Sequence, residues 1–268
     1  MSPRSSDELT ASELHRWESI RARRHRLVPS APLPTADDAA GFVREHAIVT
    51  LFGGSALPSL PAAIVGRPVR GVWWTDPEVR RILNVLTAIG PAFEQAPFVL
   101  GKQTMFDPAL GPPVQRIASN GSRREDAIAH LSRREHDLLD AVEESGKVRM
   151  DRWPAPTNAG RHARARLQVK LLVVATEFRN EHGHLSTIVR PWASSTIAKR
   201  YADAAQRWSY EDATDTLIAA SLHAAVVAPE REVRRWFVFG GDPADRLLAT
   251  GRAERIGAGR HTRLVAKD

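Results

Sequence analysis

The stretch GRHARARLQVKLLVVATEFRNEHGHLSTIVRPW, residues 160–192, changes character three times within one short segment. A burst of basic residues leads into the apolar run LLVVATEF, and the polar segment from Asn180 to His184 separates this run from a second one, LSTIVRPW. Two apolar runs on either side of a short loop that contains glycine are typical of a β-hairpin. The second half of the stretch therefore predicts two antiparallel strands between residues 172 and 189.

The basic half of the stretch predicts a helix over residues 161–169. At about 100° per residue, Ala163 and Leu167 project to one side of this helix and form a small apolar face. The nearly opposite side carries basic and amide side chains: Arg161, Arg164 and Gln168. We therefore expect the helix to bury its apolar face and to present its arginines outward.

The segment before this stretch supplies a capped helix and a short strand. In LSRREHDLLDAVEESG, which begins at Leu131, Ser132 and Glu135 form a capping-box pattern, and Gly146 fits the left-handed residue past a helix end. The helix has a stripe of apolar residues: Leu138, Leu139 and Val142. Residues 147–150 follow as an extended piece before a Pro-rich turn. The order helix, short strand, turn, basic helix and hairpin is that of a winged helix, in which the last helix reads DNA and the hairpin forms the wing.

A similar order of elements returns in residues 201–268. Three positions have the residue types that begin helices: Ser209, Pro229 and Asp242. Gly257 to Gly259 then marks the turn of a second hairpin, over residues 253–265. Residues 35–100 are interpreted as a third, degenerate copy of the same pattern.

These patterns predict a mainly α fold with small β-hairpins, an α+β protein built from three tandem winged-helix modules. The expected organisation, in chain order, is an N-terminal helix and linker at 1–34, a degenerate first module with a connection at 35–124, a central module at 125–200 and a C-terminal module at 201–268. Thr10 and Glu13 form the capping box expected to begin the N-terminal helix. The end of the first region, residues 101–124, lacks periodicity and contains three prolines, so it is expected to be a long connection.

The composition indicates a cytoplasmic protein without metal or cofactor sites. The chain has 268 residues, 43% of them hydrophobic, which is enough to bury a sizeable core. No window approaches eighteen consecutive apolar residues, so no membrane association is expected, and the first residues lack the apolar region of a secretory signal. Cysteine is absent, which excludes disulfides and thiolate metal sites. The sequence leaves the oligomeric state open.

The positive charge is concentrated in one part of the chain. The formal net charge is +7, and the segment from Lys147 to Trp192 carries nine basic residues against three acids. A basic bias in overall composition would spread the excess along the chain. The concentration instead favours a polyanionic partner, and beside a predicted winged helix this partner is double-stranded DNA.

The chain resembles a known family in several segments: GFVREHAIVTLFGGSALPSLPAAIVGRP, RARLQVKLLVV, HGHLSTIVRPW and KRYADAAQRWSYEDATDTLIAASL. They are similar to the AlkZ/YcaQ-like winged-helix DNA glycosylases, and more closely to the AlkZ-related proteins of uncertain activity. The resemblance covers roughly residues 35–265. It implies three tandem winged-helix modules around a DNA-binding channel, in a family whose enzymes repair alkylated bases and crosslinks.

The resemblance does not supply catalytic residues. The glycosylases carry a Gln-apolar-Gln or Gln-apolar-Asp motif that activates water, and the segment that would align with it, residues 47–52, reads AIVTLF. No such motif occurs anywhere in the chain. Thr50 offers neither a carboxylate nor an amide, and the nearby Glu45 is interpreted as a surface acid. The catalytic residues are therefore unknown.

Two functions remain. One is a non-catalytic DNA-binding protein related to DNA repair, and the other is a monofunctional glycosylase that acts on alkylated or crosslinked bases with a different catalytic group. Formation of abasic sites in alkylated duplex DNA would distinguish them.

The expected DNA contacts lie on the basic helix and its wing. They share a polar side chain and a place on the predicted outer surface: Arg161, Arg164, Arg166, Gln168, Lys170, Arg179, His182 and His184. His182 and His184 could also chelate a metal, but no third ligand is evident in the sequence, and a polar wing tip is the simpler interpretation. Ordinary solvated surface is the alternative for the arginines of the helix.

Overall fold

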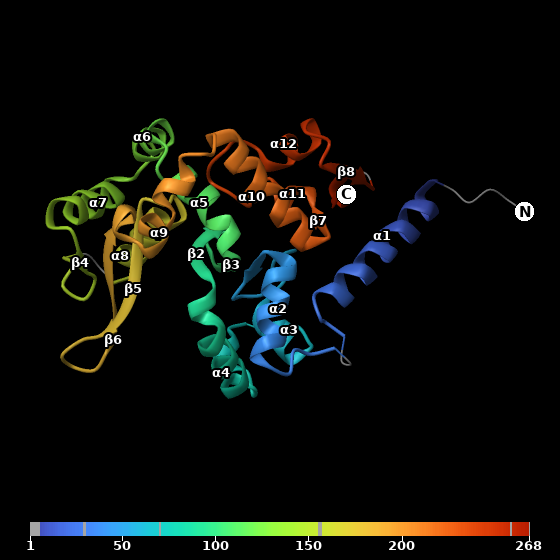
Figure 1. The fold of residues 1–268 in the computed structure, drawn as a ribbon, viewed down its shortest axis with the longest axis horizontal. Helices are drawn as coiled ribbons and strands as arrows, with labels where there is room; N and C mark the ends of the chain where they lie inside the picture. The colour runs from blue at the N-terminus through green and yellow to red at the C-terminus, as the bar shows by residue number, and fades with distance from the viewer. Residues whose placement is uncertain (1–5, 29–30, 70, 155–156, 258, 268) are drawn as a thin grey trace, which may run out of the picture. The chain divides into compact units, whose positions relative to one another are not determined.

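The fold is taken from a computed structural model, which describes residues 6–28, 31–69, 71–154, 157–257 and 259–267 (Figure 1). The chain forms two compact units, each discontinuous in sequence. The first unit comprises residues 1–95, 102–110 and 215–268, and the second comprises residues 96–101 and 111–214.

The same order of elements occurs three times along the chain. Each repeat contains a helix, a short strand, a further helix or helices and a two-stranded hairpin. The three sheets have the strand orders β1-β3-β2, β4-β6-β5 and β7-β9-β8, so in every repeat the third strand lies between the first and the second. The prediction of an α+β fold with three helix-plus-hairpin modules is confirmed, since no larger sheet joins the described strands.

The first module has a capped helix at its start. Its elements in chain order are α2 (Ala36–His46), β1 (Ile48–Thr50), α3 (Leu60–Val65), the 3-10 turn η1 (Trp73–Thr75), α4 (Val79–Ile89), the 3-10 turn η2 (Gly90–Ala92), β2 (Glu94–Val99) and β3 (Lys102–Phe106). Thr35 and Asp38 form a capping box that begins α2, and Ser59 caps α3. The amphipathic pattern of α4 buries Ile82, Val85 and Ile89.

The second module is the one that the opening stretch predicted. Its elements are α7 (Arg133–Ser145), β4 (Val148–Arg149), α8 (Thr157–Val169), β5 (Val173–Arg179) and β6 (Leu185–Pro191). Ser132 and Glu135 form the expected capping box, and Gly146 has the left-handed φ of 71° at the helix end. The hairpin β5–β6 extends past α8 in Figure 1.

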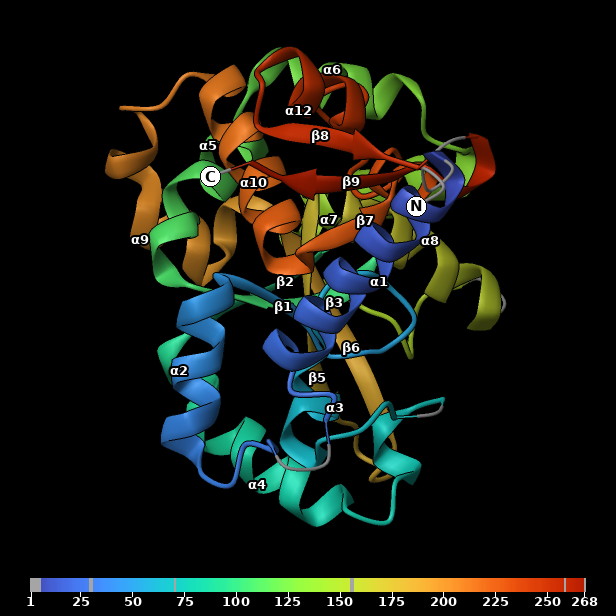
Figure 2. The ribbon, with the colours of Figure 1, turned by 90° about the vertical axis from the view of Figure 1, so that its right-hand side faces the viewer.

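The third module repeats the order near the C-terminus. Its elements are α10 (Tyr210–Ala225), β7 (Val227–Pro229), α11 (Glu230–Val233), α12 (Pro243–Ala249), β8 (Ala253–Ile256), the 3-10 turn η5 (Gly259–His261) and β9 (Arg263–Ala266). The N-terminal helix α1 (Ser6–Arg24) lies along this sheet (Figure 2), with Leu14 and Trp17 packed against buried residues of β7, β8 and β9.

Three expectations about local structure were wrong. The prediction of a long connection at residues 101–124 fails, because this region holds β3, the 3-10 turn η3 (Pro108–Leu110), α5 (Gly111–Ala118) and the start of α6 (Gly121–Ala129). Pro112 and Pro113 lie in the first turn of α5, where proline removes no helical hydrogen bond. The N-terminal helix begins at Ser6 rather than at Thr10, and the basic helix begins at Thr157 rather than at Arg161.

The second unit also contains helices outside the winged-helix order. The hairpin formed by β5, β6 and the loop between them (residues 173–191) is called the wing. The 3-10 turn η4 (Trp192–Ser194) and α9 (Thr196–Ala205) follow it. Gly111 of α5 lies so close to Tyr201 of α9 that a Cβ atom there would be 2.2 Å from the ring. Gln115 accepts a hydrogen bond of 2.9 Å from the indole of Trp192, so these helices are fixed to the base of the wing. No described helix in either unit combines the length and the apolar character needed to cross a bilayer.

Candidate nucleic-acid interface

The helix α8 has one buried face and one exposed face, as its sequence predicted. Ala163 and Leu167 are 5% and 0% exposed and pack in the core of the second module. Arg161 is exposed, and no hydrogen bond or ion pair joins it to another residue within the described ranges. Gln168 is half-buried. The expected burial of the apolar face is confirmed, and the outer face of α8 carries a cation without a counterion.

The face of the wing that is turned toward α8 becomes polar with distance from the core. In the register of the hairpin, Ala175 pairs with Val189 and Glu177 pairs with Thr187, so these four side chains share one face of the hairpin. Ala175 and Val189 belong to the core, whereas Glu177 is exposed. The polar pair therefore begins where the hairpin leaves the core beneath α8.

The loop of the wing is held by Asn180. Its side-chain oxygen accepts hydrogen bonds from the backbone N–H groups of His182 (3.0 Å) and His184 (2.9 Å). Gly183 has a φ of 75°, a conformation that suits glycine. The Arg179 guanidinium donates to the carbonyl of Gly183 at 2.9 Å. The loop is thus fixed internally, while both imidazoles remain exposed.

A recess of about 450 Å³ separates α8 from the wing. Arg164 of α8 crosses it and donates to the hydroxyl of Thr187 at 2.6 Å. The lining combines basic, acidic, amide, hydroxyl and apolar residues: Met150, Asp151, Trp153, Gly160, Arg161, Arg164, Glu177, Asn180, His184, Leu185, Ser186 and Thr187. Of the residues expected to contact DNA, Arg161, Arg164 and His184 are brought together here.

Part of the positive charge of this module is neutralised by ion pairs. Arg149 contacts Asp151 at 2.7 Å and Glu181 at 2.8 Å, and Arg152 contacts Glu181 at 3.0 Å. Hydrogen bonds from the Arg149 guanidinium lower the pKa of Asp151 to about 2 and that of Glu181 to about 2. The charge concentration read from the sequence is therefore smaller on the folded surface.

The other predicted contacts are placed outside the recess. Arg166 lies 3.4 Å from the buried carboxylate of Glu135, although its own side chain is 68% exposed. Lys170 follows the end of α8 and donates to the backbone carbonyls of Ala127 (2.9 Å) and His130 (3.4 Å), and burial lowers its pKa. The Lys170 ammonium group therefore caps the C-terminal end of α6. This makes the ammonium group less available to bind a phosphate than the sequence suggested.

The recess residues that the sequence reasoning missed include Trp153, Glu177 and Thr187. Alternation along the two strands could have placed Glu177 and Thr187 beside Ala175 and Val189. No local pattern in the Pro-rich turn indicates the position of Trp153.

Among the three equivalent helices, α8 differs in charge. It contains three arginines and no acid, whereas α12 contains one arginine and one aspartate, and α4 contains two arginines. Arg246 of α12 contacts Asp215 at 2.7 Å, and Arg81 of α4 contacts Glu78 at 3.1 Å. Of the three helices, α8 therefore has the largest excess of arginines over acids, although Arg166 lies 3.4 Å from Glu135 of α7.

The segment around β1, residues 47–52, has a structural role in this fold. Thr50 is buried, and its hydroxyl donates to the carbonyl of Phe52 (2.7 Å), with the carbonyl of Pro58 also near at 3.2 Å. Glu45 is an exposed acid that lies 3.8 Å from Arg24. Thr50 is thus a buried residue of β1, and the exposure of Glu45 agrees with its interpretation as a surface acid.

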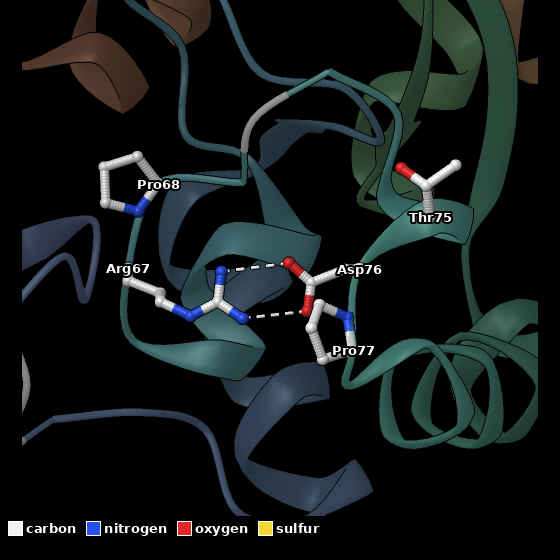
Figure 3. A pocket seen from close by; sticks show the side chains of 5 residues that line it. All are labelled: Arg67, Pro68, Thr75, Asp76 and Pro77. Atoms are coloured by element: carbon white, nitrogen blue, oxygen red, sulfur yellow. Dashed lines mark hydrogen bonds and ion pairs between the residues drawn. The ribbon is translucent and has the colours of Figure 1, made fainter.

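A second recess, of about 470 Å³, lies in the first unit beside η1 and is lined by Arg67, Pro68, Thr75, Asp76 and Pro77 (Figure 3). Arg67 donates to both carboxylate oxygens of Asp76, at 2.9 and 2.8 Å, and these bonds lower the pKa of Asp76. Glu78 adds a second acid 3.9 Å from the guanidinium. Because two carboxylates face one cation, this recess does not favour an anionic ligand.

Neither a metal-binding cluster in the described residues nor a match to a known protein assigns a function to these recesses. Within the described ranges, no group of three or more histidine, aspartate or glutamate side chains is positioned to hold a metal ion, and the rings of His182 and His184 lie 6.4 Å apart. Comparison of the chain with known protein families, curated proteins and solved structures finds no match.

Proposed function

We propose that this protein binds double-stranded DNA through α8 and the β5–β6 wing of its second module. The observation that carries the proposal is the arginine-bearing outer face of α8, which lies next to a long, internally fixed wing and contains no acid. In a winged helix, the equivalent helix enters the major groove while the wing follows the adjacent backbone. Arg161 and Arg166 would contact phosphates, and Gln168, His182 and His184 would lie at the edges of the interface.

The proposal places the chain beside the AlkZ/YcaQ-like family as a DNA-binding relative without the Gln-containing catalytic motif. Two observations support a non-catalytic protein over a glycosylase. The motif is absent from the sequence, and the hydroxyl of Thr50 is already engaged with backbone carbonyls. DNA binding requires neither the Gln-containing motif nor a free hydroxyl group at Thr50.

A salt titration of duplex binding tests the proposal. Each phosphate contact contributes about −0.9 to the slope of log K against log salt concentration. The double variant R161A/R166A should therefore reduce the magnitude of this slope by about 2. Arg161 and Arg166 are both exposed, so the variant should remain folded.

The matched control is K199A/R207A, which removes two exposed cations from α9 and the segment just after it. It changes the net charge by the same amount but lies outside α8 and the wing, so the slope should stay at the wild-type value. Equal slopes for all three proteins would refute the proposed interface, and a loss in both variants would mean that binding follows net charge alone.

A further inference from the structure

The recess between α8 and the wing contains an acid that phosphate binding does not need. Glu177 is exposed at its rim and interacts electrostatically with Arg164, but no hydrogen bond or ion pair joins it to another residue in the part of the chain that the structure describes. A carboxylate repels phosphate, but it accepts hydrogen bonds from N–H groups. Glu177 therefore favours a ligand that presents donors.

Arg164 adds donors on the opposite side of the recess. Its Nη1 donates to Thr187, whereas its Nε is buried without an acceptor in the described structure. The Arg164 guanidinium lines the recess, and its N–H groups other than the buried Nε are the donors available to a ligand there. The recess thus presents an acceptor on the wing and a donor on the helix.

Trp153 and Met150 form an apolar wall. Both pack against the core of the second module and lie close to Gly160 of α8. A Cβ atom on Gly160 would be 3.2 Å from Met150 Cε and 3.4 Å from Trp153 Cδ1, so the glycine allows the indole to lie close to the helix. An aromatic side chain beside a donor and an acceptor suits a flat heterocycle.

We propose that this recess binds an unpaired guanine base. Guanine presents the donors N1–H and N2–H₂ on one edge and the acceptors O6 and N7 on another. Glu177 would accept from the first edge, Arg164 would donate to O6, and Trp153 would contact the face of the ring. The volume of about 450 Å³ lies within the usual range for small-ligand pockets.

This inference rests on the proposed DNA-binding function, since α8 would bring the recess to the duplex. The guanine could come from a base extruded from DNA or from a free guanine nucleotide. The chemistry in the recess is the same for both sources, and the experiment separates them.

The test compares affinities for duplexes that are identical except at one position. One duplex is fully paired, the others carry a single bulged G, a bulged C or a bulged abasic residue, and GMP is titrated separately by tryptophan fluorescence. Stacking of one base on an aromatic ring corresponds to roughly 5- to 150-fold in affinity. We expect the wild type to prefer the bulged G over the abasic bulge by about ten-fold or more.

Variants assign this preference to the recess. W153L keeps an apolar side chain but removes the aromatic ring and should bring the preference close to one, whereas W153F should retain most of it. E177Q should reduce the discrimination between bulged G and bulged C. The matched control is E144Q, an exposed acid near the end of α7, which should behave as the wild type.

The outcomes distinguish the two proposals. If paired duplexes bind but bulged G gives no advantage over the abasic bulge, the guanine inference fails and the DNA-binding proposal stands. If no duplex binds but GMP does, with loss in W153L and E177Q, the recess is a nucleotide site and the proposed DNA function fails. If neither DNA nor GMP binds, both are overturned.

Discussion

Two buried histidines in the first unit predict a loss of stability at mildly acidic pH. His25 and His46 are 2% and 0% exposed, and their rings lie 5.6 Å apart in an edge-to-face arrangement. His25 donates from Nε2 to the carbonyl of Ala224 at 2.9 Å, and His46 donates from Nε2 to the carbonyl of Arg24 at 3.2 Å. Burial lowers the pKa of His25 to about 3 and that of His46 to about 4.

The direction of the effect follows from these values. Between pH 7 and pH 5, both histidines stay neutral in the folded protein, whereas in the unfolded chain a histidine with a pKa of about 6.5 takes up a proton. Protonation therefore favours the unfolded state as the pH falls below 6.5. Linkage gives a loss of about 2 kcal/mol for each histidine between pH 7 and pH 5, or about 4 kcal/mol for the pair. The loss continues until the pH reaches the folded-state values.

The assay compares urea unfolding of the wild type and the double variant H25Q/H46Q at pH 7 and pH 5. Hydrogen exchange of peptides from α2 and α10 reports the opening of the first unit separately. The variant is expected to be less stable at pH 7, because its new side chains fit the buried sites less well. Its stability should nevertheless change with pH by about 4 kcal/mol less than that of the wild type.

The control is H182Q, which removes an exposed imidazole from the tip of the wing and should keep the wild-type pH dependence. If H25Q/H46Q and the wild type lose equal stability between pH 7 and pH 5, the two histidines are not held neutral by folding, and the reasoning from burial is refuted.

Two further changes test contacts within each unit separately. G111A places a Cβ atom 2.2 Å from the Tyr201 ring and should lower the free energy of unfolding by about 1–3 kcal/mol in urea titrations. The control G121A has nothing within 4 Å of its new Cβ, so equal stability of both variants would contradict the close packing. R67A removes the partner of the buried Asp76 and should lower the melting temperature (Figure 3). Because pairing lowers the pKa of Asp76 from 3.8, this difference should shrink as the pH falls below 4, and a constant difference would show that the pair is not the cause.

The local elements of this protein are determined by short-range features that a sequence displays directly. Ser132 and Glu135 lie three residues apart, and their side chains bond to the backbone groups that begin α7. The two apolar runs around Asn180–His184 can bury their side chains only as paired strands, and the loop between them is short. Capping and alternation act within a few residues, which is why the three-module α+β fold could be predicted from the sequence.

The region around Pro112 and Pro113 was predicted wrongly for a related reason. Proline lowers the local preference for helix, but its effect depends on its position, and in the first turn it removes no hydrogen bond. What holds α5 in place is the close approach of Gly111 to Tyr201 and the bond from Trp192 to Gln115. These contacts join residues far apart in the chain, so no local sequence pattern predicts them.

The charge of the candidate site was likewise decided by tertiary structure. The sequence located the basic segment, but only the fold joins Arg149 to Glu181 and brings the Lys170 ammonium to the carbonyl of Ala127. The recess itself is lined by Glu177 and Thr187 of the wing and by Trp153, which packs near Gly160 of α8. The free energy of an ion pair or a packed ring depends on distance in space and on burial, and the order of residues fixes neither until the chain has folded.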